Sequence, residues 1–243
     1  MAVFADDVIG TIGGGRIEFE AIDEARLRLA PAASGDSPGG AKPADTVRYP
    51  LGPSLGQCCG GVMHLRYELV NAADLPELGV RLARKSLPIT VFGGGHVGKA
   101  LIRVLTSLPF DVVWIDSRDG IFPADVPHNV TCEHSDPVQA AVQQLAPGTC
   151  VLIMSFSHAE DLDVVAACLL RQRLQADLPF IGLIGSKTKW STFRHRLEAR
   201  EFTATELAMV TCPIGIHGIT SKEPEVIAVS VAAQILQVVS SPG

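Results

Sequence analysis

The sequence contains few aromatic and few charged residues. Phe, Trp and Tyr make up 5% of its 243 residues, charged residues make up 19%, and hydrophobic residues make up 47%. A core of this composition must consist mainly of Val, Ile, Leu and Ala, which is typical of parallel sheets that are buried on both faces. The formal net charge of −6 gives no electrostatic reason to bind nucleic acid or an anionic membrane, and we expect neither as a partner.

Cysteine is scarce as well, and its spacing argues against two classes of protein. Six cysteines are too few for a disulfide scaffold in a chain of this length, and no two of them form a CxxC pair of the kind that zinc sites use. A reducing compartment, the cytoplasm, is therefore expected. The cysteines stand at positions 58, 59, 132, 150, 168 and 212.

Neither a secretory leader nor a membrane span is indicated. The sequence begins "MAVFADDVIG", which is acidic where a secretory leader is basic. The most apolar late stretch, at 226–239, is shorter than the roughly 20 residues that a bilayer-spanning helix needs. We predict that this stretch forms a buried helix.

The hydrophobic pattern predicts an α/β protein with two domains. A small N-terminal α+β domain is expected over residues 1–87, and a Rossmann-like domain over residues 88–243. Strict alternation of hydrophobic and polar residues indicates strands, and hydrophobic residues at helical spacing indicate helices. In the first domain these patterns predict a strand and turn at 8–15, a helix at 16–30, a flexible loop at 31–45, a half-buried strand at 62–70 and a connector at 71–88.

From residue 88 onward, short apolar runs alternate with segments of helical spacing. This alternation is typical of βαβ units, and it predicts a parallel sheet with helices on its faces. The expected strands lie at 89–92, 112–115, 150–154 and 180–184, and the expected helices lie at 97–108 and 161–173.

The first of these strands is followed by a glycine fingerprint, "GGGHVG" at 93–98. In such a motif, Gly93 allows a tight turn, Gly95 lets a phosphate approach the backbone, and Gly98 lets the helix pack close to the strand. The start of that helix would offer free N–H groups to the phosphate. The alternative interpretation is that the glycines only pack a helix on a sheet and bind nothing.

An acidic residue follows the glycine fingerprint at the distance that a nucleotide site requires. Asp116 ends the next predicted strand, 18 residues after Gly98 (116 − 98), where a ribose-binding acid is expected. Arg118 leaves the choice between NAD and NADP open, because an arginine at this place could accept a 2′-phosphate.

Three polar residues, Ser155, Ser157 and His158, come directly after the strand predicted at 150–154. The carboxyl ends of the strands face the ligand in doubly wound sheets, so these residues are expected to line the crevice. His158 could serve as an acid or base, as a metal ligand or as an orienting donor. Because no second catalytic partner is evident, we assign no catalytic residue and do not favour hydride transfer.

A predicted helix start further on carries two lysines. Ser186 is expected to cap this helix, and Lys187 and Lys189 fall in its first turn, where the helix dipole disfavours positive charge. A bound anion would remove the conflict, whereas solvated lysines would need no ligand.

The loop at 211–229 is punctuated by glycines and is a further candidate for the site. His217 and Lys222 could face the same crevice as the glycine fingerprint. Glu223 and Pro224 then give the apolar C-terminal helix a favourable start.

The adjacent pair Cys58 and Cys59 lies in the stretch "LGQCCGG". Free cysteine is often buried as a small hydrophobic residue, so both side chains could belong to the core. Alternatively, one of them supplies a soft thiolate to a metal. This would require N–H groups or a cation to lower the thiol pKa from its ordinary value of about 8.5. Gly56, Gly60 and Gly61 would allow a turn that aims N–H groups at the sulfur.

Several stretches occur in order across nearly the whole chain: "GTIGGGRIEFEAI", "LGPSLGQCCGG", "VFGGGHVGKAL", "WIDSR", "SFSHAEDL", "GLIGSKTKWSTFRHRL" and "TCPIGIHGITSKEPEVIAVSVAAQIL". Together they resemble the XdhC/CoxI family, the accessory factors of xanthine dehydrogenase and related molybdenum hydroxylases. The resemblance implies that the protein binds molybdenum cofactor, a molybdopterin that carries the metal. It further implies that the protein holds the cofactor while a terminal oxo ligand is replaced by sulfur and then helps to insert it into the target enzyme.

The resemblance also implies partners and a site. It favours a cofactor chaperone over a turnover enzyme, with a target hydroxylase and a cysteine desulfurase as partners and a homodimer as the oligomer. One of Cys58 and Cys59 would be a molybdenum ligand, and a dinucleotide such as NAD is a further candidate cofactor. From the motifs and the resemblance together, the residues expected to bind the cofactor are Cys58, Cys59, Gly93, Gly95, His96, Gly98, Asp116, Ser157, His158, Ser186, Lys187 and Lys222.

Two alternative functions rest on the glycine fingerprint: an NAD(P)-dependent oxidoreductase, which His158 would serve, and a nucleotide-sensing Rossmann module. The cysteine pair discriminates, because neither alternative has a use for it. Family members usually carry a strand and a Gly-Ser-x-Pro-Arg stretch ahead of the first motif, which begins here at Gly10. We therefore expect either a start further upstream or a small domain that lacks this strand.

Overall fold

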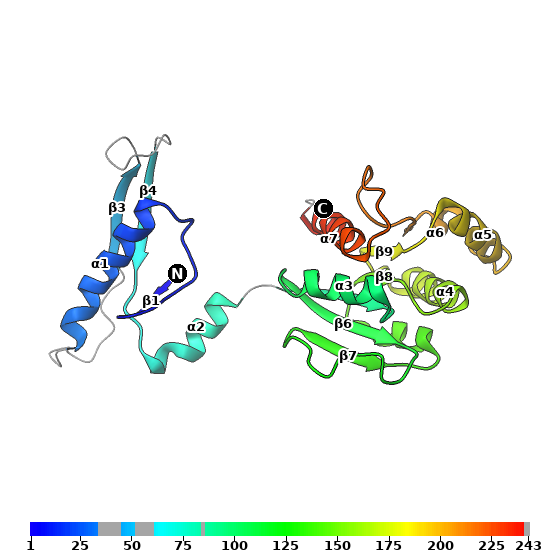
Figure 1. Cartoon of the computed structure of the whole chain (residues 1–243), viewed down its shortest axis with the longest axis horizontal. Coiled ribbons are helices and arrows are strands. Elements are labelled where there is room, and N and C mark those ends of the chain that lie inside the picture. Colours follow the sequence, from blue (N-terminus) through cyan, green and yellow to red (C-terminus); the bar gives the residue numbers. More distant parts are fainter. Residues whose placement is uncertain (34–44, 52–60, 84–85, 241–243) are drawn as a thin grey trace. The chain divides into compact units, whose positions relative to one another are not determined.

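The computed structural model of the chain describes residues 1–33, 45–51, 61–83 and 86–240. It divides into two compact units, Met1–Ala83 and Arg84–Gly243 (Figure 1). The chain is α/β, with a Rossmann-like unit and a smaller N-terminal unit, as the sequence predicts.

The N-terminal unit combines one long helix with two strand pairs. Its first pair is antiparallel, as is its second, and Ile17 and Ala21 of the helix are its buried hydrophobic residues among those described. The elements are β1 (Ala2–Val3), β2 (Val8–Ile9), α1 (Arg16–Ala33), β3 (Asp45–Leu51), β4 (Gly61–Tyr67), the 3₁₀ helix η2 (Ala72–Asp74) and α2 (Leu75–Leu82).

The helix and the half-buried strand predicted in this unit are confirmed by α1 and β4. The sequence prediction missed β3, although Val47, Tyr49 and Leu51 alternate with more exposed neighbours. Pro50 obscured the pattern, because proline is unusual inside a strand. The segment predicted as a connector contains the short helix α2, which buries no side chain.

The second unit contains a six-stranded sheet in which all neighbouring strands are parallel. The strand order is β10-β9-β8-β5-β6-β7, so the chain reverses its direction of progress across the sheet between β5 and β8. The strands are β5 (Leu87–Phe92), β6 (Phe110–Asp116), β7 (Val130–His134), β8 (Cys150–Ile153), β9 (Phe180–Leu183) and β10 (Val210–Thr211).

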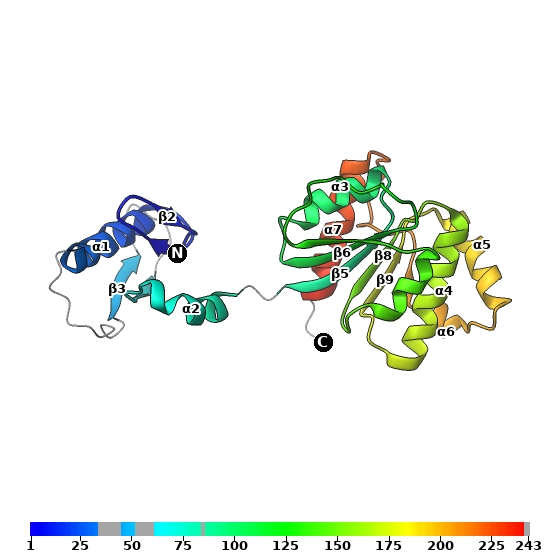
Figure 2. The same cartoon turned by 90° about the horizontal axis from the view of Figure 1, so that it is seen from below.

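Helices cover both faces of this sheet (Figure 2). On one face α3 (His96–Leu105) packs against α7 (Pro224–Ser240), and on the other α4 (His158–Gln175) packs against the 3₁₀ helix η3 (Val138–Gln144). Two short helices, α5 (Lys187–Glu198) and α6 (Ala204–Leu207), contribute side chains to the same hydrophobic cluster as α4.

Successive residues of each central strand lie on opposite faces of the sheet. They pack in two different hydrophobic clusters, one on each face, which is why both faces are hydrophobic. Ile89 and Val91 of β5 pack with α3 and α7, whereas Phe92 packs with α4. The apolar stretch near the C-terminus forms the buried helix α7, as predicted. In the part of the chain that the structure describes, no helix is both long and apolar enough to span a bilayer.

A candidate ligand crevice at the carboxyl ends of the strands

The glycine turn between β5 and α3 is closed at Gly93, Gly94 and Gly98 and open at Gly95. A Cβ atom at Gly93 would lie 2.0 Å from the carbonyl oxygen of Met154, and one at Gly98 would lie 2.0 Å from the carbonyl oxygen of Gly93. A Cβ atom at Gly95 would meet no atom of the described residues within 4 Å. Gly95 is also the N-cap of α3, so the open space lies at a helix start whose first N–H groups have no partner within the helix.

Asp116 supports this turn from the end of β6. Its Oδ2 accepts a hydrogen bond of 2.6 Å from the Gly94 N–H, and Arg118 donates to both oxygens through its backbone N–H, Nε and Nη2 at 2.8–2.9 Å. Burial acts to raise the pKa of Asp116, but the hydrogen bonds from Arg118 and Gly94 outweigh it and lower the pKa below the ordinary value. Both carboxylate oxygens are thus already engaged within the chain, and a ribose contact by Asp116 stays a prediction.

The loop after β8 lies beside the glycine turn. A Cβ atom at Gly93 would lie 3.1 Å from the Ser155 nitrogen. The Ser155 Oγ is buried and has no hydrogen-bond partner among the described residues. Ser157 is the N-cap of α4, where its hydroxyl accepts a hydrogen bond of 3.2 Å from the Glu160 N–H. His158, the first residue of α4, is exposed, and its ring approaches Phe193 edge-on at 6.4 Å.

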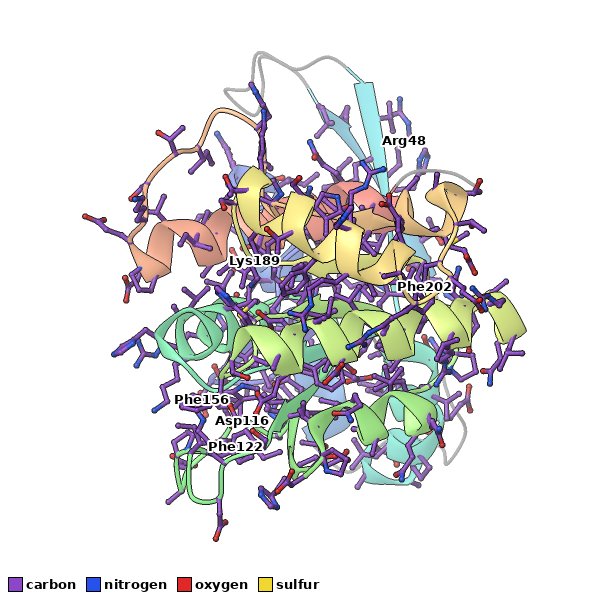
Figure 3. The ribbon with its side chains drawn as sticks, turned by 90° about the vertical axis from the view of Figure 1, so that its right-hand side faces the viewer. Arg48, Asp116, Phe122, Phe156, Lys189 and Phe202 are labelled. Carbon is purple, nitrogen blue, oxygen red and sulfur yellow. The ribbon has the colours of Figure 1, made fainter. Side chains whose placement is uncertain are left out.

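Two lysines were predicted at the start of α5, where the helix dipole disfavours positive charge. The structure provides a negative partner for one of them. Ser186 caps α5, as expected. The Lys189 side chain is 11% exposed, and its Nζ donates to Asp161 Oδ2 at 2.6 Å and to the Ile184 carbonyl at 2.8 Å. Asp161 therefore neutralises Lys189. Of the two lysines in the first turn of α5, Lys187 is the one left to attract a bound anion. Figure 3 shows Lys189, Asp116 and Phe156 toward one end of the unit and Phe202 toward the other.

The remaining candidate residues Lys187 and Lys222 line two different hollows. A cavity of about 270 Å³ lies at the ends of β9 and β10, beside the loop before α7. Lys222 lines it, while Lys187 lines a shallower hollow of about 340 Å³ along α5. His217 is exposed. The residues around the first cavity are Ile184, Gly185, Pro213, Ile214, Ile219, Thr220, Ser221, Lys222, Ile227 and Ser230.

Cys58 and Cys59 lie outside the described residues. Of the four described cysteines, Cys150 and Cys212 have thiols whose pKa burial raises to about 11, and burial raises the pKa of Cys168 to about 12. Burial also raises the pKa of Cys132. Within the described ranges, no three His, Cys, Asp or Glu side chains are grouped closely enough to hold a metal ion.

Sequence reasoning missed the partners that organise this crevice. The interactions of Arg118 with Asp116, of Asp161 with Lys189 and of Ser117 with Glu160 join residues of different loops or elements. The apolar strand ends gave a signal for Asp116 and for the loop after β8. Nothing in the local pattern indicates which of the polar residues pair.

The strand order and the glycine turn at the first strand define this unit as a Rossmann domain. The family described as the XdhC Rossmann domain matches residues 89–235, more than half of the chain, and the chain belongs to this family. The family resemblance noted in the sequence is therefore confirmed.

Similar proteins span most of this chain. YqeB of Escherichia coli (strain K12), an uncharacterized protein, is 28% identical over 245 residues, which cover 98% of this chain and 40% of YqeB. The chain thus spans about two fifths of the length of that curated relative. A crystal structure of a xanthine dehydrogenase from Bacillus halodurans matches with a TM-score of 0.65 at 17% identity, covering 96% of this chain and 85% of that one. A Rossmann-fold NAD(P)-binding family protein from Shigella flexneri gives a TM-score of 0.40 at 19% identity, over 64% of this chain and 87% of that one.

Proposed function

We propose that this XdhC-family protein is an accessory factor that binds molybdenum cofactor and assists its insertion into xanthine dehydrogenase or a related molybdenum hydroxylase. One observation carries the proposal: the turn before α3 is closed at Gly93 and Gly98 but open over Gly95. A phosphate of the cofactor suits this place, because unpaired N–H groups and the helix dipole favour an anion at a helix start.

The cavity beside β9 and β10 supports the proposal of a ligand that has its phosphate at the glycine turn and its other end in this cavity. Only β8 separates β5 from β9 in the sheet, and neighbouring strands are about 4.8 Å apart, so the strands that lead to the glycine turn and to the cavity are about 10 Å apart. A phosphate-bearing pterin has two such ends. Ser155 Oγ, which has no hydrogen-bond partner in the described part of the chain, follows β8, between the two places, and Lys222 lines the cavity.

The other predicted residues have supporting parts in the proposal. Ser157 and Ser186 fix the starts of α4 and α5, and His158 and Lys187 are the exposed donors at those starts. His96 opens α3 directly after Gly95. Each of these contacts with the cofactor is a prediction.

For the metal end, we propose a thiolate from Cys58 or Cys59. The described cysteines all have raised pKa values, so none of them is prepared as a thiolate at neutral pH. When bound, the molybdenum centre would be the place at which a terminal oxo ligand is exchanged for sulfur. If the thiolate is essential, either Cys58→Ser or Cys59→Ser loses the cofactor while its thermal midpoint is unchanged.

The proposed partners follow from the same reasoning. A xanthine dehydrogenase among the similar structures supports a hydroxylase of that type as the target. A cysteine desulfurase would supply the sulfur, and a homodimer is the proposed oligomer. Copurification with the target enzyme tests the first of these proposals, and the mass of the purified protein in solution tests the homodimer.

An NAD(P)-dependent oxidoreductase or a nucleotide-sensing module is the second candidate. Asp116 stands where NAD sites place an acidic residue, which favours it. The support is weaker because the Asp116 oxygens already accept hydrogen bonds from Gly94 and Arg118.

The experiment that tests the proposed function is cofactor retention by Gly95→Val. The purified parent is incubated with molybdenum cofactor, and bound pterin is measured after desalting by the fluorescence of its oxidised form. We expect Gly95→Val to lose at least ten-fold in retention, because its methyl groups occupy the space of the phosphate, while its thermal midpoint stays near that of the parent.

Gly79→Val is the matched control for that variant. Gly79 lies in α2, and a Cβ atom there would also meet none of the described residues within 4 Å. Equal retention by Gly95→Val, Gly79→Val and the parent would show that the open turn is structural only.

A further inference from the structure

The helix α5 carries a basic surface in a chain that is acidic overall. Residues 187–200 contain five of the chain's 20 Lys and Arg residues and one acidic residue, Glu198, whereas the formal net charge of the whole chain is −6. Figures 1 and 2 show α5 at the outer side of the Rossmann unit, beside α4. Positive charge is therefore concentrated on one outer helix of this unit.

The shallow hollow along α5 follows one face of the helix. Its lining residues recur at the three- and four-residue spacing of a single helix face, and we call them the α5 stripe: Lys187, Trp190, Ser191, Arg194, His195 and Glu198. At 1.5 Å per residue the stripe is about 16 Å long. A surface of this shape matches about three turns of a second helix laid along it.

The cations of the α5 stripe can pair with carboxylates from outside the chain. Lys187 is exposed and makes no hydrogen bond or ion pair with the other described residues. Arg194 lies 4.0 Å from Glu198, and both side chains are 47% exposed. His195 is 93% exposed and lies 3.8 Å from the same carboxylate. Exposed pairs of this kind contribute little to stability, so carboxylates of a partner could replace them at small cost.

Trp190 adds an apolar contact to the same stripe. It packs partly against the hydrophobic cluster of α4, and it also lines the hollow. Aromatic residues and arginine are enriched in the central parts of protein interfaces. The stripe thus offers one apolar anchor with a cation on either side, at Lys187 and Arg194.

We propose that the α5 stripe is a docking surface for an acidic amphipathic helix of a partner protein. The cations select carboxylates, the length of the stripe selects a helix of about three turns, and Trp190 selects an apolar residue between the carboxylates. The net charge of −6 disfavours the approach of a long polyanion such as nucleic acid. This proposal goes beyond cofactor binding and does not depend on it.

The probe for this surface is an alanine-based peptide of about 18 residues, long enough to form a helix, with several Glu residues and one Leu on one face. Its binding to the full chain is measured by fluorescence anisotropy and compared with that of the same peptide with Gln in place of Glu. We expect the Glu peptide to bind at least ten-fold more tightly at low salt. The preference should shrink as salt is added, because exposed charges are screened.

Tryptophan fluorescence shows whether the peptide lies on the stripe. The chain contains two tryptophans, and Trp114 is only 1% exposed within the other hydrophobic cluster. Binding should shift the emission of Trp190 to shorter wavelength, because the peptide removes it from water, and should leave that of Trp114 unchanged.

Two variants weaken the proposed contact in different ways. Arg194→Glu reverses one cation and should lower the affinity for the Glu peptide about five-fold, because a repulsion replaces an attraction. Ser191→Glu adds a carboxylate to the stripe without removing a cation, and it should also lower the affinity. Arg103→Glu is the matched control, because it makes the same charge change at an exposed residue of α3, on the other face of the sheet, and it must keep the affinity. Thermal midpoints verify that all three variants are folded.

The docking surface is wrong if the Glu and Gln peptides bind equally well, or if Arg194→Glu and Arg103→Glu lose the same affinity. Tighter binding of a single-stranded oligonucleotide than of the Glu peptide would assign the stripe to nucleic acid and overturn the proposal. A salt-sensitive dimer that Arg194→Glu dissociates would assign it to a second copy of this chain, with the same consequence. Failure of the proposed function is recognised separately, because the parent would then retain no molybdenum cofactor whatever the peptide result.

Discussion

The two units bury hydrophobic residues to very different extents. In the Rossmann unit, two hydrophobic clusters cover both faces of the sheet. In the N-terminal unit, the described part of α1 buries Ile17 and Ala21 but leaves Phe19 and Leu27 about 70% exposed, at 71% and 69%. The Rossmann unit is thus held by close packing around a rigid crevice, whereas pairing of β3 with β4 and polar contacts such as Arg28–Asp45 contribute more to the small unit.

The largest expected effect comes from filling a closely packed glycine. Gly93 and Gly61 both have φ in the left-handed region, at +121° and +137°, but only a Cβ at Gly93 would collide with backbone. We expect Gly93→Val to lower the free energy of unfolding by more than about 4 kcal/mol. Gly61→Val should cost about 1–3 kcal/mol, from backbone strain alone.

Urea unfolding of the two glycine variants measures this difference. Equal losses of stability would mean that packing around the glycine turn is no closer than packing around the hairpin, and the contrast between the units would fail at its strongest point.

A buried ion pair should matter more than an exposed one. Lys189→Met leaves Asp161, which is 3% exposed, without its cation, and we expect a loss of about 3–5 kcal/mol. Arg81→Met removes the partner of Glu68 in the small unit, where both side chains are well exposed, so little change is expected. Thermal unfolding at neutral pH checks both, and a larger loss in Arg81→Met would reverse the comparison.

The smallest expected effect is a pH dependence. The pKa of Asp116 is lower in the folded chain than its ordinary value, so its contribution to stability is complete above about pH 4 and is lost as the pH falls through the folded pKa. Asp116→Asn should therefore show a thermal midpoint that falls less between about pH 4 and pH 2 than that of the parent. Parallel curves for the two proteins would show that Asp116 gains nothing from Arg118 and Gly94.

How much of the fold could be predicted depends on how locally each element is encoded. The central strands β5, β6, β8 and β9 are continuous apolar runs, and the sequence predicts all four. The edge strands β7 and β10 were missed, because the first is only partly buried and the second has two residues.

The candidate site, like the fold, was predictable where it is encoded by residues close together in the sequence. The close packing at Gly93 and Gly98 was predictable, because a strand, a turn and a helix follow one another along the chain. Phosphate binding at Gly95 stays a prediction. The ion pair of Lys189 with Asp161 was not predictable, because it joins residues 28 positions apart in the chain. The contact of Arg118 with Asp116 is local, but the sequence does not show that the Arg118 side chain turns back onto that carboxylate.

The proposed function depends on one proposal above all, that the Rossmann unit binds molybdenum cofactor through the open turn at Gly95. The most direct measurement is a pair of titrations of the purified chain, one with molybdenum cofactor and one with NAD. Both are monitored by calorimetry. We predict saturable binding of molybdenum cofactor that is at least ten-fold tighter than that of NAD and is lost in Gly95→Val. Tight binding of NAD with no uptake of molybdenum cofactor would contradict it.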